Sequence, residues 1–216
     1  MAYPTRIYVD RMSSKYVNTK NSMPQMSLFG LGTKPAHEHN YFFALSPSPD
    51  VRGQLTKCAE ELRATQDFNG SWISSERYHL TLHHLGQYSE VRSDLVSRAI
   101  TAASRIQAKP FDLVLDQFMC FDSRTGRYPC AATSANELPD LNNFWQLLKN
   151  NLLAVRLGEK LSSSFKPQAT LLYNRQPLGE PRSVEPIHWH VIDFVLIESL
   201  VGKSEYIELG RWRLSA

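Results

Sequence analysis

A short segment that alternates between apolar and polar residues constrains the fold of this chain most. It covers residues 78–86, where His79 and Thr81 alternate with Leu80 and Leu82. Successive side chains of an extended strand point to opposite faces. The segment therefore predicts a strand that buries Leu80 and Leu82 and presents an imidazole beside a hydroxyl on its other face.

A second segment, residues 166–172, repeats this rhythm with one difference. Gln168 stands where the first segment has His79, and Thr170 stands where it has Thr81. We expect two similar lobes whose polar strand faces meet at one cleft. Each pair taken alone could also be an ordinary solvated strand face, because threonine favours sheets.

Length and composition indicate one folded domain with an extension. A chain of 216 residues with 42% hydrophobic residues is large enough for a buried core. Residues 1–39 keep no apolar period and hold more Lys and Arg than Asp and Glu. We predict a poorly ordered, mildly basic extension over residues 1–39, with one short docked piece around residues 26–31, and a folded domain over residues 40–216. The extension could be a solvated tail or an arm that binds nucleic acid.

From residue 41 onward, apolar patterns predict strands and helices in alternation. We expect a helix over residues 51–66 with Asp50 as its N-cap. The other predicted helices are 90–107 and 138–156, and the predicted strands are 41–45, the two polar segments, 111–115, 128–133, 189–200 and 206–214. This order predicts an α+β fold with a mostly antiparallel sheet rather than a doubly wound parallel one.

The cysteines and the apolar runs bear on location. Cys58, Cys120 and Cys130 are isolated and odd in number, which predicts neither a disulfide framework nor a metal motif. No apolar run is long enough to cross a membrane, and no signal-like start is present. We expect a cytoplasmic protein with reduced cysteines. The formal charge of +3 is compatible with an anionic ligand without requiring one.

The paired segments suit chemistry at a phosphate. Histidine can accept or donate a proton near neutral pH, because its unperturbed pKa is about 6.5. A threonine hydroxyl on the same face can bind a phosphate oxygen. Positioned donors of this kind can stabilise developing charge without a metal ion.

These residues resemble the signatures of the two-histidine (2H) phosphoesterase superfamily, and more narrowly of the LigT-like RNA 2′,3′-cyclic phosphodiesterases, also called 2′-5′ RNA ligases. The first signature is similar to residues 79–86 and the second to residues 165–172. The resemblance extends from about residue 41 to the end of the chain. It also covers the opening strand at residues 42–45 and the closing pattern of Gly202, Lys203, Tyr206, Arg211 and Trp212.

The resemblance implies a bilobal, pseudo-twofold α+β fold with mostly antiparallel sheets and flanking helices around a central basic cleft. The implied activity is that of a hydrolase that opens 2′,3′-cyclic phosphates on RNA ends to 2′-phosphates. Some members join or cleave 2′-5′ linkages. It also implies that no cofactor or metal is needed and that the ligands are RNA ends or cyclic nucleotides. Carried over, His79 is a catalytic acid or base, and Thr81 and Thr170 hold the phosphate. We expect a monomer.

Two positions depart from the family pattern. Gln168 occupies the place of the second histidine, and glutamine cannot exchange a proton near neutral pH. Loss of one general acid or base lowers a rate by about 10²–10⁴-fold. Tyr173 stands where relatives often carry a basic residue, a role that Arg175 could take instead. The alternative is therefore a non-catalytic protein that binds RNA ends or nucleotides, and a third reading is an interaction protein with a filled cleft.

Further candidates for substrate binding follow from position. His83 shares strand parity with His79, so it is expected at the cleft as a rim residue or a substitute proton carrier. Arg127 lies in an expected hairpin turn, where it could contact phosphates or be solvated. Lys203 and Tyr206 could cover the cleft. His188 and His190 share a strand face, but no Cys or acidic pair completes a metal site.

Overall fold

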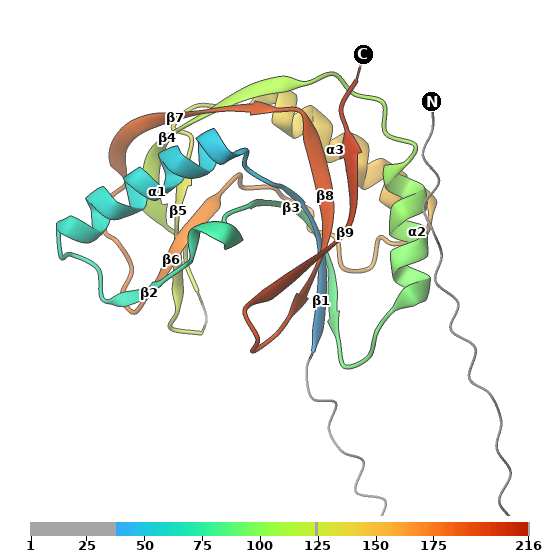
Figure 1. Cartoon of the computed structure of the whole chain (residues 1–216), viewed down its shortest axis with the longest axis horizontal. Helices are drawn as coiled ribbons and strands as arrows, with labels where there is room; N and C mark the ends of the chain where they lie inside the picture. Colours follow the sequence, from blue (N-terminus) through green and yellow to red (C-terminus); the bar gives the residue numbers. More distant parts are fainter. Residues whose placement is uncertain (1–37, 124, 216) are drawn as a thin grey trace, which may run out of the picture. The chain divides into compact units, whose positions relative to one another are not determined.

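The computed structural model describes residues 38–123 and 125–215. Within them, nine strands form one sheet in the order β7-β4-β5-β6-β3-β1-β8-β9, with the short β2 paired to β6. All strand pairs are antiparallel, and three α-helices accompany the sheet (Figure 1). The α+β prediction is confirmed. The elements are β1 His39–Leu45, α1 Pro49–Ala64, β2 Gly70–Trp72, β3 Leu80–Tyr88, α2 Ser93–Ala103, β4 Phe111–Cys120, β5 Tyr128–Thr133, α3 Pro139–Ala154, β6 Ala169–Asn174, β7 Arg182–Val191, β8 Asp193–Leu200 and β9 Glu205–Arg213.

The sheet consists of two halves that meet at a single residue pair. One half is β6-β5-β4-β7 and the other is β3-β1-β8-β9, each read outward from the junction. Only Leu80 of β3 pairs with Ala169 of β6. We call this pair the seam. The two polar segments thus provide the innermost strand of each half, as the bilobal prediction requires.

Apolar side chains form a separate cluster on each face of the sheet. The large core holds Leu80 and Ala169 together with the buried faces of all three helices. A smaller cluster on the other face contains Phe42, Ala44, Val195 and Ile197, with Tyr206 packed against it. This second cluster belongs to the half that contains β3, and it forms part of the support for the site described below.

Helix α1 begins differently from the prediction. Its N-cap is Ser48, whose side chain accepts a hydrogen bond from the backbone N–H of Val51, and Asp50 lies in the first turn instead. An acidic residue in the first turn still stabilises the helix N-terminus. Proline at the first helical position explains the early start, since its fixed φ suits that place.

Two predicted strands differ from the structure, and two short elements have no counterpart in the prediction. The segment 189–200 is two strands, β7 and β8, which meet at Ile192. Strand β4 runs on to Cys120, beyond the predicted end at residue 115. Strand β2 and the following 3-10 turn, Ser75–Arg77, were not predicted, because three-residue elements leave too little periodicity to detect.

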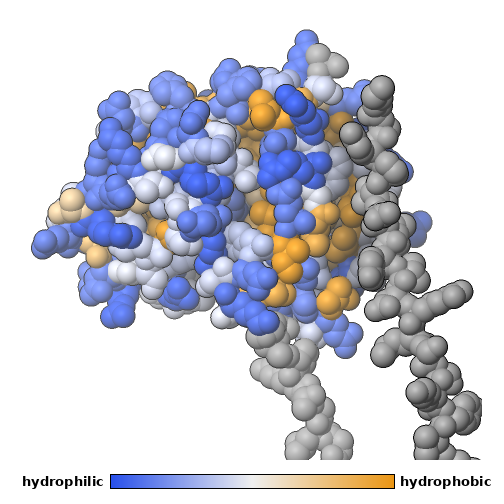
Figure 2. Space-filling view, in the orientation of Figure 1, coloured by the Kyte–Doolittle hydropathy of each residue, from blue (hydrophilic) through white to orange (hydrophobic). Residues whose placement is uncertain are grey.

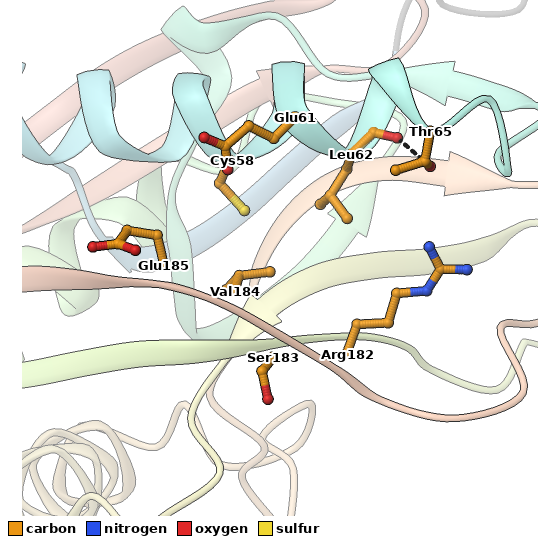
Figure 3. A pocket seen from close by; sticks show the side chains of 8 residues that line it. All are labelled: Cys58, Glu61, Leu62, Thr65, Arg182, Ser183, Val184 and Glu185. Atoms are coloured by element: carbon orange, nitrogen blue, oxygen red, sulfur yellow. Dashed lines mark hydrogen bonds between the residues drawn. The ribbon is translucent and has the colours of Figure 1, made fainter.

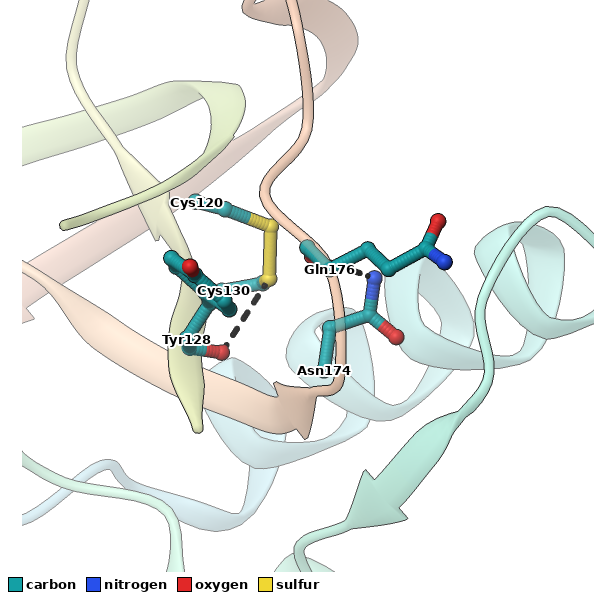
Figure 4. The surroundings of a disulfide bond; sticks show 5 residues. All are labelled: Cys120, Tyr128, Cys130, Asn174 and Gln176. Atoms are coloured by element: carbon teal, nitrogen blue, oxygen red, sulfur yellow. Dashed lines mark hydrogen bonds between the residues drawn. A yellow bond between two sulfur atoms is a disulfide. The ribbon is translucent and has the colours of Figure 1, made fainter. Parts of the chain in front are cut away.

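The prediction that all cysteines stay unpaired is wrong. Cys120 and Cys130 form a disulfide that joins β4 to β5, where the two residues are direct cross-strand partners (Figure 4). Sequence spacing could not reveal this, because the pair is brought together by the β4–β5 hairpin. Cys58 is the remaining cysteine and is buried. The cysteines therefore no longer support a reducing compartment.

The surface differs between the two halves of the sheet. Figure 2 shows mostly hydrophilic side chains over α1 and a gathering of apolar ones over the region of β8 and β9. None of the described helices is long and apolar enough to cross a membrane. The predicted docked piece at residues 26–31 and nearly all of the predicted extension lie outside the described residues, although His39 is already part of β1.

Candidate functional site

The seam brings the two polar segments face to face. Because Leu80 pairs with Ala169 in antiparallel register, His79 lies across from Thr170, and Thr81 lies across from Gln168. Directly opposed residues in such a register have Cβ atoms about 5 Å apart. Leu80 and Ala169 are fully buried, whereas these four polar residues are all partly exposed. We call them the four motif residues; they share the sheet face opposite the large core.

His79 sits in an aromatic and polar environment that fixes its ring. Its centroid lies 5.0 Å from that of Phe42 and 5.4 Å from that of Tyr206. Its Nδ1 donates a hydrogen bond of 2.8 Å to the backbone carbonyl of Arg77. A donated proton at Nδ1 leaves the Nε2 lone pair free in the neutral ring.

The electrostatics of His79 favour the neutral ring. Burial lowers its pKa below the ordinary 6.5, and the nearby positive charge of Arg77 lowers it further, against the opposing effect of the Arg77 carbonyl. Burial acts this way because it disfavours the charged form. At neutral pH His79 is therefore a neutral imidazole whose Nε2 can accept a proton.

Arg77 is a further candidate for the site, which the sequence analysis does not predict. Its Nη2 donates to the hydroxyl of Tyr206 over 3.3 Å, and its guanidinium stacks 4.7 Å from the centre of that ring. The 3-10 turn that carries it is held by Arg52 of α1, which donates to the carbonyl of Ser75. The only sequence signal was its position two residues before His79, which places it on the same strand parity.

Beside the motif residues lies a pocket of about 500 Å³ between the two halves of the sheet. We call it the cleft pocket. Its lining contains two arginines, two aromatic side chains and no Asp or Glu. The lining residues are Ser71, Trp72, Ile73, Arg77, Arg127, Tyr173, Ser199, Leu200, Val201, Gly202 and Ser204.

The predicted binding residues fall into two groups. Tyr173 and Arg127 line the cleft pocket, where the Arg127 guanidinium lies 5.1 Å from the Tyr173 ring centre, and Tyr206 contacts His79. Lys203 lies in the β8–β9 turn and is exposed, between two residues that line the pocket. Arg175 follows β6 as an exposed residue outside the pocket lining. The functional roles of all five stay predictions.

The predicted orientation of His83 toward the cleft is wrong. A register shift in the β1–β3 pair makes Thr81 the partner of Ala44 but His83 the partner of Phe43, which belongs to the large core. Such a bulge inserts one residue and reverses the alternation of faces. His83 is 2% exposed, and its ring stacks on Trp145 at 4.7 Å.

His83 instead ties β3 to α3. Its Nε2 donates to the carbonyl of Trp145 over 2.9 Å, and the indole of Trp145 donates to the carbonyl of Leu82 over 2.8 Å. Burial lowers the pKa of His83 to about 4. It is therefore a neutral core residue. The bulge leaves the next residue, His84, exposed and bonded to the side chain of Asn40.

Another pocket, between α1 and β7, holds none of the predicted site residues (Figure 3). Its one thiol is that of Cys58, which points from α1 toward Val184 of β7. Burial raises the pKa of this thiol to about 11. Because the thiolate is the reactive form, Cys58 is not an activated nucleophile.

Among the described residues, no group of three or more His, Cys, Asp or Glu side chains is arranged to hold a metal ion. His190 is exposed on β7 and its Nδ1 bonds to Asp112 over 2.7 Å. His188 is also exposed, and its backbone N–H donates to the side chain of Gln54 of α1. Both histidines are thus surface residues.

Comparison with known proteins identifies similar sequences and folds. A family model described as LigT like Phosphoesterase matches residues 45–130, a range that includes His79 and Thr81 and ends before Gln168. No curated protein matches the chain closely enough to count as a relative.

Several solved structures share the fold. E. coli LigT complexed with ATP is 22% identical with a TM-score of 0.63, over 83% of this chain and 99% of LigT. The structure of the same protein complexed with NADP+ is 23% identical with a TM-score of 0.64, over 84% of this chain and 100% of LigT. The protein TT0787 of Thermus thermophilus is 21% identical with a TM-score of 0.64, over 81% of this chain and 97% of that protein.

Proposed function

We propose that this chain is a LigT-like phosphoesterase that acts on ends of RNA or nucleotides that carry a 2′,3′-cyclic phosphate, because a LigT-like family model matches residues 45–130 and solved LigT structures share the fold. The proposed reaction is hydrolysis to the 2′-phosphate, slowed by the glutamine at position 168. The observation that carries this proposal is the seam register, which sets His79 and Thr81 against Thr170 and Gln168. The nucleotides in the E. coli LigT complexes, ATP, 3′-AMP and NADP+, support a nucleotide ligand.

In the proposed reaction, His79 acts as the general base. Its Nε2 takes a proton from a water molecule as the water oxygen bonds to phosphorus. The hydroxyls of Thr81 and Thr170 donate hydrogen bonds to the non-bridging oxygens, where negative charge increases in the transition state. The state of His79, neutral with Nδ1 protonated, suits this role.

The second half of the reaction lacks a dedicated acid. As the bond between phosphorus and the 3′ oxygen breaks, that oxygen must gain a proton to become a hydroxyl. Gln168 can donate a hydrogen bond to it but cannot transfer the proton, which then comes from solvent. We therefore expect turnover about 10²–10⁴-fold below that of a site with both histidines.

The first experiment measures turnover of a 2′,3′-cyclic mononucleotide, and of an oligonucleotide with that end, in the presence of a chelator. We expect slow formation of the 2′-phosphate that is abolished in His79→Gln. His190→Gln, which removes an exposed imidazole on β7, is the matched control and should retain the wild-type rate. The same assay reports 2′-5′ ligation through the appearance of longer products. Binding without any product would contradict hydrolysis.

The decisive variant is Gln168→His. If only a proton donor is missing, this change should raise the rate by about two orders of magnitude or more. The gain should disappear in the double variant that also carries His79→Gln. A Gln168→His protein that binds the cyclic nucleotide without faster turnover would contradict the role given to position 168.

The second candidate is a binding protein that has lost turnover on the same fold. Gln168 favours it, because an amide keeps the hydrogen bonds to a phosphate and removes the proton transfer. It predicts tight binding of cyclic-phosphate ends by the wild type with no product over long incubation. A monomeric state, a cytoplasmic location and independence from metal ions stay predictions.

A further inference from the structure

We propose that the cleft pocket binds a second anionic group of the same ligand, the neighbouring phosphodiester of an oligonucleotide. The inference rests on the proposed function, since it assumes that the reacting phosphate lies at the four motif residues. It names the preferred ligand: a nucleic-acid end of at least two nucleotides rather than a cyclic mononucleotide.

Among the described residues, Arg77 lacks the carboxylate partner that other arginines of this fold have. Four other arginines form ion pairs with carboxylates: Arg92, Arg98, Arg182 and Arg211. Arg77 is half-buried, yet in the described part of the chain it has no carboxylate partner, and its buried Nε–H has no acceptor. A partly desolvated charge without a partner is destabilising, and a bound anion would remove this penalty.

The lining of the cleft pocket carries positive charge and no negative charge. Arg127 also lines it without a carboxylate partner in the regions that the structure describes. No acidic residue lines the pocket, whereas Ser199 and Ser204 bring hydroxyl groups to it. A concave surface that carries charge of one sign concentrates ions of the opposite sign. This pocket is therefore suited to an anion.

The cleft pocket is separate from the four motif residues. None of the four motif residues lines it. It is nevertheless joined to them through Arg77, whose carbonyl orients His79 while its side chain reaches the pocket. A single small phosphate at the motif residues would leave the pocket empty. A ligand with two neighbouring phosphates would occupy both places.

The experiment compares binding of three probes to the wild-type protein: a 2′,3′-cyclic mononucleotide, a dinucleotide ending in the same cyclic phosphate, and that dinucleotide with an uncharged methylphosphonate linkage. We expect the charged dinucleotide to bind at least about tenfold more tightly than the other two. Arg77→Gln should remove most of this preference, because the backbone carbonyl that orients His79 is kept. Arg77→Lys, which keeps the charge, should restore part of it.

Salt dependence provides an independent readout. For single strands, each phosphate contact contributes about −0.7 to the slope of log K against log salt. The slope for the dinucleotide should therefore become shallower by about that amount in Arg77→Gln, but not in the control Arg105→Gln, an exposed arginine outside the pocket lining.

Each result of the binding comparison supports or overturns a named part of the proposal. Equal affinity for the mononucleotide and the charged dinucleotide overturns the inference and leaves the proposed function intact. Tight binding of the methylphosphonate probe overturns it in favour of base stacking on Trp72 or Tyr173. Failure of all three probes to bind contradicts the proposed function itself.

Discussion

His79 and His83 lie four positions apart in the sequence but reach opposite faces of the sheet. His79 faces Phe42 and Tyr206 with its Nε2 free, whereas His83 is enclosed by the core and bonded to α3. Both have lowered pKa values because of burial, but only His79 lies on the sheet face where we propose that the ligand binds. A lowered pKa alone therefore does not distinguish a candidate catalytic histidine from a buried structural one.

His83 makes the stability of the fold depend on pH. Its pKa of about 4 lies below the ordinary 6.5, so the unfolded chain binds its proton more readily than the folded one. The stability from the neutral ring is present above pH 6.5 and is lost as pH falls toward 4, by roughly 3 kcal/mol in total.

This dependence can be measured by urea unfolding between pH 7 and 4. The wild type should lose stability faster than His83→Gln over that window, while His190→Gln should follow the wild type. Parallel curves for the wild type and His83→Gln would show that His83 does not supply the effect.

The pH dependence of turnover tests whether the pKa of His79 is lowered. A general base with a lowered pKa stays active below the ordinary value, so the acidic limb of the rate should lie below pH 6.5. An NMR titration of the imidazole should give the same midpoint. A midpoint above 6.5 would contradict the burial that we assign to this ring.

The strands and helices with clear periodicity could be predicted, and the local exceptions could not. Residues 128–133 were predicted with the bounds that β5 has, because one apolar strand is flanked there by turn residues. The orientation of His83 was missed because a bulge in β3 depends on pairing with β1, which is a tertiary property. Arg77 was missed because no pattern marks a single cation in a three-residue turn.

At the scale of elements, the β4–β5 hairpin carries Arg127 to the cleft pocket, and the Cys120–Cys130 disulfide closes the hairpin. A crosslink over a loop of this length lowers the entropy of the unfolded chain and stabilises the fold by about 3 kcal/mol. The double variant Cys120→Ser with Cys130→Ser should lose about that much in urea unfolding.

The disulfide prediction has an internal control. A dithiol reductant should lower the wild-type midpoint toward that of the double variant and should leave the double variant unchanged. Equal midpoints for the oxidised wild type and the double variant would contradict a stabilising crosslink.

At the scale of the whole described fold, the two halves of the sheet are each broad and share one large core, but their strands pair only at Leu80–Ala169. The sequence could indicate two similar polar strands, and their repeated rhythm predicted that they meet. The sequence could not indicate that β3 and β6 pair through one residue each, because the number of paired residues depends on how far these two strands diverge. The comparisons with LigT structures confirm the fold at this scale.

Ligand binding should tighten this narrow contact. Backbone amides of β3 and β6 near the seam should exchange with deuterium more slowly when a cyclic-phosphate oligonucleotide is bound, because a ligand held by both strands opposes their separation. Amides in the centre of β8, distant from the seam in strand order, provide the reference. Unchanged exchange at β3 and β6 under saturating ligand would argue against a site shared by both strands.

The narrow contact also determines what a relative motion of the two halves can change. Residues next to a pivot move little when the bodies on either side rotate, whereas residues far from it sweep through large arcs. His79 and Gln168 flank the seam, whereas the cleft pocket is lined from both halves, by Arg127 on one side and by the β8–β9 turn on the other. A rotation of the halves about the seam would thus change the width of the cleft pocket while the four motif residues keep their spacing.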